Sequence, residues 1–90
     1  MTQIEIDCAD ITSAGQLHQV LAHALHFPHD YGHNLDALFD CLTECRADRE
    51  LIFYHWHSLQ YHLKDYSEKA LYVLKYACEE NPHLTVTLHP

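Results

Sequence analysis

The sequence predicts one α/β domain that spans residues 1–90, with a three-stranded parallel sheet and four helices in the order β-α-α-β-α-α-β. Three observations lead to this fold class. Segments near both ends of the chain alternate between apolar and polar residues, a continuous apolar and aromatic run lies in the middle, and two pairs of amphipathic segments lie between them. Strands separated by helices form parallel sheets with right-handed crossovers. Ninety residues, 48% of them hydrophobic, suffice for one domain with one core.

The three predicted strands differ in their apolar patterns. In the first strand Ile4, Ile6 and Cys8 alternate with polar residues, and in the last strand, over residues 84–88, apolar residues alternate with threonine. A period of two indicates strands with one buried face, which suits the edges of the sheet. Residues 51–56 are apolar or aromatic nearly throughout, as is typical of a strand buried on both faces. We therefore expect this segment to form the central strand.

Apolar residues at helical spacing predict the first helix. The spacing i, i+3, i+4, i+7, i+8 is followed by Leu17, Val20, Leu21, Ala24 and Leu25. Thr12 or Ser13 can cap the N-terminus of this helix. The helix should end before Pro28, because the residue that precedes a proline avoids helical geometry.

Two more helices are predicted between the second and third strands. The first of them is short and begins at His57 or Ser58. Ser67 is the candidate N-cap of the other, which ends at Asn81-Pro82. The core side of the longer helix consists of Ala70, Leu71, Leu74, Ala77 and Cys78, and a separate stripe along its edge consists of Val73, Tyr76 and Glu80.

Residues 28–44 combine a loop with an acidic helix. We expect Gly32 to supply a backbone conformation that other residues resist, and Asn34 to cap the helix. At about 100° per residue, the buried side of the helix consists of Leu35, Leu38 and Leu42, and the opposite side consists of Asp36, Asp40 and Glu44. The helix dipole favours a carboxylate in the first turn only. A row of carboxylates beside two aromatic residues that we expect to be partly exposed, Tyr31 and Phe39, therefore indicates a protein-binding surface rather than an ordinary solvated face.

Charge and composition exclude several function classes. The net charge is -8, from 13 acidic and 5 basic residues, which opposes direct binding of nucleic acid and suits a basic partner. No apolar run approaches the roughly 18 residues that a membrane span needs. The chain also begins without the basic start and apolar block of a signal peptide. We therefore expect a cytoplasmic protein, monomeric when free, in which the four cysteines are reduced.

The ten histidines raise the alternative of a His-rich metal-binding domain. The sequence contains no CxxC pattern and no HExxH pattern. It also contains no recognisable nucleophile motif and no glycine-rich phosphate loop. We therefore expect no cofactor, no metal site and no enzymatic activity. An acidic adaptor that binds some other basic protein is a second alternative.

One stretch of the chain closely resembles a known family. The order Pro-x-x-Tyr-Gly-x-Asn-Leu-Asp-Ala-Leu-x-Asp-Cys-Leu-Thr, over residues 28–43, is similar to the barstar family of intracellular inhibitors of bacterial ribonucleases. Further matches along the chain are Leu17-His18-Gln19, Val73, Ala77, Glu80 and Leu84-Thr85. The chain differs from the family pattern at Asp30, Phe39 and Tyr76, where the family has an aromatic residue, a tryptophan and a glutamate.

The resemblance implies a small domain that plugs the active site of a basic, barnase-like ribonuclease or a related toxin, in an antitoxin-like or immunity-like role. It implies that Asp40 takes the position of an RNA phosphate and that Asp36 makes a second acidic contact. The residues that we expect to bind the partner are Asp30, Tyr31, Gly32, Asn34, Leu35, Asp36, Phe39, Asp40, Thr43, Glu44, Val73, Tyr76 and Glu80.

Overall fold

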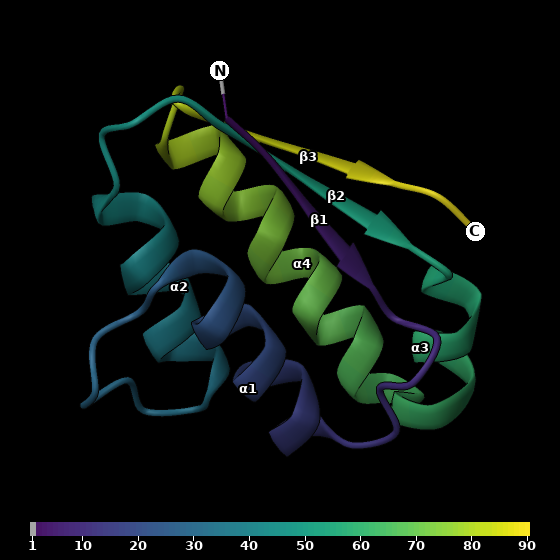
Figure 1. Cartoon of the computed structure of the whole chain (residues 1–90). Coiled ribbons are helices and arrows are strands. Elements are labelled where there is room, and N and C mark those ends of the chain that lie inside the picture. The colour runs from purple at the N-terminus through teal and green to yellow at the C-terminus, as the bar shows by residue number, and fades with distance from the viewer. Residues whose placement is uncertain (1) are drawn as a thin grey trace.

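The computed structural model describes residues 2–90 and confirms the predicted order of elements (Figure 1). Met1 lies outside the described residues. The strands are β1 (Thr2–Asp7), β2 (Arg49–Tyr54) and β3 (Leu84–Leu88). The helices are α1 (Ala14–Leu25), α2 (Leu35–Glu44), α3 (Trp56–Leu63) and α4 (Asp65–Glu80).

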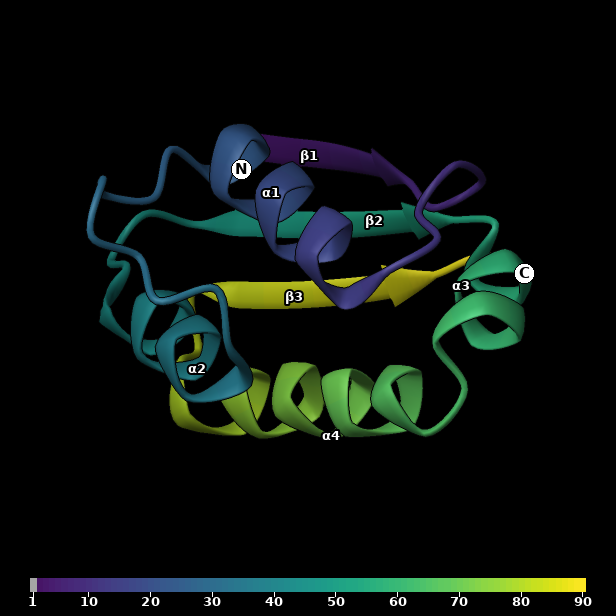
Figure 2. The ribbon, with the colours of Figure 1, turned by 90° about the horizontal axis from the view of Figure 1, so that it is seen from below.

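The strands form one parallel sheet in the order β1-β2-β3, so β2 is central as predicted. Ile6 of β1 lies beside Phe53 of β2, and Phe53 lies beside Leu88 of β3. Figure 2 shows α1 in front of the sheet and α4 beside its β3 edge, with α2 against the C-terminal half of α4. The molecule therefore has one layer of sheet and one layer of helices.

The prediction that β2 is buried on both faces is confirmed only in part. Leu51 and Phe53 point into the helix layer and have no exposed surface. On the other face Ile52 is buried, but Tyr54 is half-buried and its hydroxyl donates to a carboxylate oxygen of Glu5 at 2.8 Å. Neighbouring side chains of the sheet, rather than a second layer of helices, therefore cover this face. The strand also begins earlier than predicted, at Arg49. It ends earlier, at Tyr54, because Trp56 belongs to α3.

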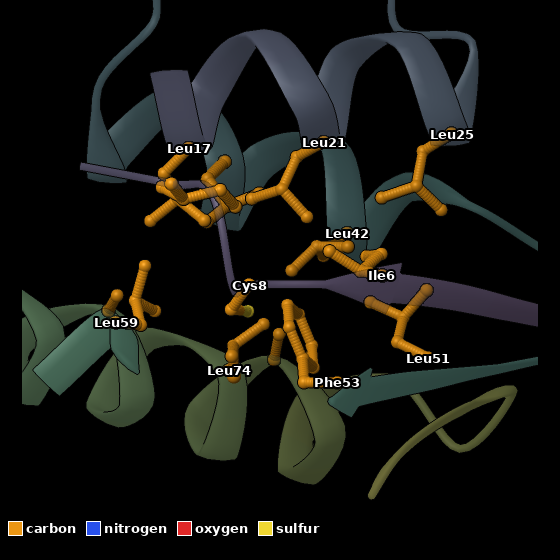
Figure 3. Packing of buried hydrophobic residues seen from close by; sticks show 14 of the residues in the cluster. Ile6, Cys8, Leu17, Leu21, Leu25, Leu42, Leu51, Phe53, Leu59 and Leu74 are labelled. Atoms are coloured by element: carbon orange, nitrogen blue, oxygen red, sulfur yellow. The ribbon is translucent and has the colours of Figure 1, made fainter. Parts of the chain in front are cut away.

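The hydrophobic core lies between the sheet and the helices (Figure 3). Each helix supplies at least one buried leucine to this core: Leu17, Leu21, Leu42, Leu59 and Leu74. Cys8 is fully buried, and burial raises the pKa of its thiol to about 11. The four cysteines are free thiols. No helix among residues 2–90 is long and apolar enough to cross a membrane.

The helix ends follow the predictions in the first half of the chain and at Asn81, which ends α4, but the starts of α3 and α4 differ. Ser13 caps α1 by accepting the amide of Gln16 at 3.2 Å. The predicted start of α3 at His57 or Ser58 is wrong, because the helix begins at Trp56 after a left-handed His55 (φ 60). The predicted N-cap at Ser67 is also wrong. Its hydroxyl donates to the carbonyl of Lys64 at 2.6 Å inside the first turn of α4.

Candidate functional site

The loop before α2 is a compact turn that ends in a well-formed helix cap. The amide of Tyr31 donates to the carbonyl of Pro28 at 3.0 Å. The side-chain oxygen of Asn34 accepts the amide of Ala37 at 2.8 Å, which confirms the predicted N-cap. The amide group of the same side chain donates to the carbonyl of Gly32 at 3.1 Å. Asn34 therefore fixes both the loop and the first turn of the acidic helix.

The predicted role of Gly32 in backbone conformation is wrong. No described glycine has a positive φ, and the left-handed residue in this loop is His33, with φ 52. Gly32 is instead required by close approach. A Cβ atom at this position would lie 3.0 Å from the Nδ2 atom of Asn34 and 3.4 Å from the Cβ atom of Ala37. A larger residue would therefore require the side chain of Asn34, which caps the helix, to give way slightly.

Tyr31 is buried, with 6% of its surface exposed, so the expectation of a partly exposed ring beside the acidic row is wrong. Its hydroxyl lies 2.6 Å from Nδ1 of His18, a fully buried residue of α1. The Nε2 atom of His18 lies 2.6 Å from the hydroxyl of Tyr66 in α4. A neutral imidazole donates through one nitrogen and accepts through the other, so both hydroxyls are satisfied. The loop is thereby anchored to α1 and α4.

Sequence reasoning missed His18, although the residue lies next to Leu17 on the apolar side of α1. Burial is the main cause that lowers the pKa of this histidine, and the nearby His33 lowers it further. The ring of Phe27 packs on the ring of Tyr31 with centroids 4.8 Å apart. The position of the loop therefore depends on a neutral histidine in the core.

A groove of about 430 Å³ lies between α2 and α4. It brings together six of the predicted partner residues: Leu35, Asp36, Phe39, Asp40, Val73 and Tyr76. The apolar residues of the groove are half-buried, namely Leu35 and Phe39 of α2 and Val73 of α4. The two aspartates are exposed. We call this feature the acidic groove. Its chemistry combines apolar contact with negative charge.

The two helices that form the acidic groove are joined at their C-terminal ends. The side-chain amide of Asn81, which follows α4, donates to the carbonyl of Leu42 and to the carbonyl of Cys45, each at 2.8 Å. These are carbonyls at the end of α2, where a helix leaves such groups unpaired. Asn81 is buried, with 2% exposed. The sequence indicated only that Asn81 ends α4, and this second function was missed.

The exposed acidic row continues beyond the groove. Asp36, Asp40 and Glu44 are exposed on α2, as predicted. The ion pairs within residues 2–90 are His55–Asp7 and His83–Asp48, so none of the three carboxylates of the row is paired. An unpaired row of like charges leaves a negative field outside the helix, which suits a positively charged partner.

The other predicted partner residues lie around the acidic groove rather than in it. Asp30 is exposed in the loop, and Glu80 is exposed at the end of α4. Thr43 is half-buried, and its hydroxyl donates to the carbonyl of Phe39 at 2.8 Å. The hydroxyl is therefore engaged within its own helix. In the part of the chain that the structure describes, no three histidine, cysteine or acidic side chains are placed to hold a metal ion.

Comparison with known proteins identifies the family. The model of the family described as "Barstar (barnase inhibitor)" matches residues 1–89. A protein of Bacillus subtilis (strain 168) named "Putative ribonuclease inhibitor YrdF" is 37% identical to this chain over 81 residues, which is 89% of each chain. With its three parallel strands, its four helices and this match over nearly its whole length, the chain belongs to the barstar family.

Proposed function

We propose that this protein is a non-enzymatic inhibitor of a basic ribonuclease, and that it blocks the active site with α2 and the loop before it. The observation that carries the proposal is the acidic groove, in which exposed Asp36 and Asp40 stand over an apolar floor. A ribonuclease active site must attract RNA phosphates, so it presents cations to its ligand. A row of carboxylates on a fixed helix has the complementary charge. The family and the name of the relative support the same function.

Asp40 has the central role in this proposal. It is exposed in the middle of the acidic row and borders the groove, so a cationic side chain of the ribonuclease can reach it from solvent. In the complex Asp40 occupies the position of an RNA phosphate, and Asp36 supports it one turn earlier. Leu35 and Phe39 pack against the enzyme around these charges and exclude water. Exclusion of water strengthens each charge pair at the centre of the interface.

The loop residues contribute through position. Gly32, Asn34 and the buried Tyr31 hold the start of α2 in one place, so the acidic row is already ordered before the partner arrives. Less ordering on association means that more of the contact energy appears as affinity. Tyr31 therefore acts by positioning the loop, while the rim of Asp30, Glu44 and Glu80 adds negative charge.

An inhibition assay tests the proposal. The protein is titrated against a panel of basic bacterial ribonucleases of the barnase type, and RNA cleavage is followed. We expect full inhibition of at least one enzyme at a one-to-one ratio. Undiminished cleavage across the panel would reject inhibition of this enzyme class and favour an acidic adaptor of the same fold.

Asp40→Ala tests the mechanism against a matched control. Loss of one partner from a desolvated charge pair costs about 2–5 kcal/mol or more, a range to which barstar complexes themselves contributed. This loss corresponds to about 30-fold to 5,000-fold weaker binding by calorimetry. Asp10→Ala removes the same charge from an exposed turn between β1 and α1 that does not line the groove, and should leave affinity nearly unchanged. Equal effects of the two substitutions would show that only net charge matters.

A further inference from the structure

A second hollow lies next to the acidic groove on the surface of α4. Its volume is about 240 Å³, and it is lined by Tyr72, Lys75, Tyr76 and Glu79. Tyr76 also lines the acidic groove, so the two hollows share a wall. Tyr72 in turn lines a third hollow further along the helix, towards Asp65. The surface that carries the acidic groove is therefore continuous with the exposed side of α4.

Two tyrosine rings dominate this second hollow. Tyr72 and Tyr76 lie one helical turn apart, with ring centroids 4.8 Å apart at an angle of 50° and with hydroxyl oxygens 3.3 Å apart. They remain 61% and 46% exposed, and are among the few large apolar side chains left at the surface of residues 2–90. We call them the tyrosine pair. Tyrosines offer a large contact area at low conformational entropy, which is why binding surfaces are rich in them.

The charges around the tyrosine pair indicate what it binds. The exposed Glu79 and Lys75 line the same hollow and offset each other, so the net negative charge nearby comes from Asp36 and Asp40 at the adjoining groove. Within the described chain, the cation that lies over a tyrosine ring is Lys64 over Tyr61, at 5.6 Å. The faces of the tyrosine pair are therefore available to a cation from outside the molecule.

The geometry points to an arginine side chain of the basic partner as the ligand of the tyrosine pair. We propose that the partner surface extends past the acidic groove, and that Tyr72 and Tyr76 receive this arginine by cation–π contact while Glu79 accepts a hydrogen bond from it. A planar guanidinium stacks on aromatic faces and donates to a carboxylate at the same time, which suits this set of groups better than an ammonium. The identity of the partner as a ribonuclease rests on the proposed function, whereas the arginine site is a property of the free protein.

The first test uses the free protein and a small probe. N-acetylarginine amide is titrated into protein with ¹³C-labelled tyrosine rings, and N-acetylcitrulline amide is the neutral control of nearly the same shape. We expect the ring signals of Tyr72 and Tyr76 to move with the arginine probe and not with the citrulline probe. The buried ring of Tyr31 should stay unchanged. Unmoved signals, or equal movement with both probes, would overturn the proposal.

Variants sharpen this titration. Tyr72→Leu keeps apolar bulk on an exposed helix position but removes the π face, and should weaken binding of the arginine probe about 2-fold to 5-fold, the range for a cation–π contact at an exposed site. Lys75→Gln removes the positive charge from the hollow and should strengthen binding. Unchanged affinity in both variants would reject the site. Movement of both ring signals on increasing protein concentration without any probe would show that a second copy of the chain is the occupant, and would also reject it.

The second test uses a ribonuclease that the protein inhibits. Tyr72→Leu should weaken the complex about 2-fold to 30-fold, the larger value applying if the arginine loses its water on binding. Asp40→Ala should weaken the complex far more. The two proposals fail separately, because the probe titration contains no ribonuclease. Failure of ribonuclease inhibition leaves the arginine site standing, and failure of the probe titration leaves inhibition through the acidic groove standing.

Discussion

Acidification should destabilise the protein through one buried histidine. His18 has no exposed surface, and each ring nitrogen lies 2.6 Å from a tyrosine hydroxyl, of Tyr31 on one side and of Tyr66 on the other. The charged ring would have to exist inside the core, with the ring of His33 at a centroid distance of 6.4 Å. Burial therefore lowers the pKa of His18 below its ordinary value of 6.5, and the charge of His33 lowers it further.

The direction and size of the effect follow from proton binding. Below pH 6.5 the unfolded chain takes up a proton at His18, while the folded protein takes it up only at lower pH. The unfolded state thus binds more protons in this window, so the free energy of unfolding falls as the pH falls. For one proton the slope is at most about 1.4 kcal/mol per pH unit. One unit below pH 6.5 the loss is therefore at most about 1.4 kcal/mol, which would be a sizeable part of the stability of a small domain.

Urea unfolding between pH 7.5 and pH 5.0, followed by the fluorescence of the buried Trp56, measures this slope. His18→Gln can donate to one hydroxyl and accept from the other but does not titrate, so the fall of the unfolding free energy with pH should be less steep than in the original protein. His23→Gln, on the exposed side of the same helix, is the matched control for the replacement of a histidine by glutamine. An unchanged slope in His18→Gln would refute the reasoning. So would a folded-state pKa of His18 above 6.5 in an NMR titration.

Three further predictions concern charge and packing. Association with an inhibited ribonuclease should slow as salt rises, because the field of Asp40 and its neighbours is screened beyond about 10 Å at 0.1 M salt; a salt-independent on-rate in stopped-flow mixing would remove the electrostatic argument. Leu42→Ala should lower the free energy of unfolding in urea by about 2–5 kcal/mol, since Leu42 is fully buried, and half-buried Leu35→Ala by less. Glu44→Gln should raise the free energy of unfolding by about 0.3–1 kcal/mol, because a negative charge at the C-terminal end of a helix opposes the helix dipole. Asp36→Asn, in the first turn of the same helix, should lower the free energy of unfolding. Equal effects of the two substitutions in calorimetry would contradict this account.

The order of elements was predictable because each strand and helix carries its own period of apolar residues. The central place of β2 followed from its apolar run, and the caps Ser13 and Asn34 followed from their residue types. The starts of α3 and α4 were not predictable in the same way, although the end of α4 at Asn81 was. His55 and Lys64 adopt positive φ values of 60 and 52, a conformation that residues other than glycine rarely adopt. Neither residue type signals such a turn, so the helix starts were placed too late.

The site was predictable where it depends on the spacing within one helix. The exposed row on α2 and the stripe with Val73 on α4 meet in the acidic groove, and helical periodicity indicates both. The burial of Tyr31 was not predictable, because it depends on His18, 13 residues earlier, and on Tyr66 in another helix. A histidine within an apolar stripe interrupts the pattern from which burial is inferred. Contacts between elements therefore limited the prediction more than any local feature did.

The acidic helix is held in place by groups that lie outside it. Within α2, the carboxylates at i, i+4 and i+8 repel one another, and only Asp36 has support from the helix dipole. Such a helix of ten residues has little stability of its own. Its buried leucines, the amide of Asn81 at its C-terminal end and the anchored loop at its N-terminal end supply what the local sequence lacks. This arrangement lets the exposed side carry charges that disfavour the helix, so the acidic row is ordered and unpaired before any partner binds.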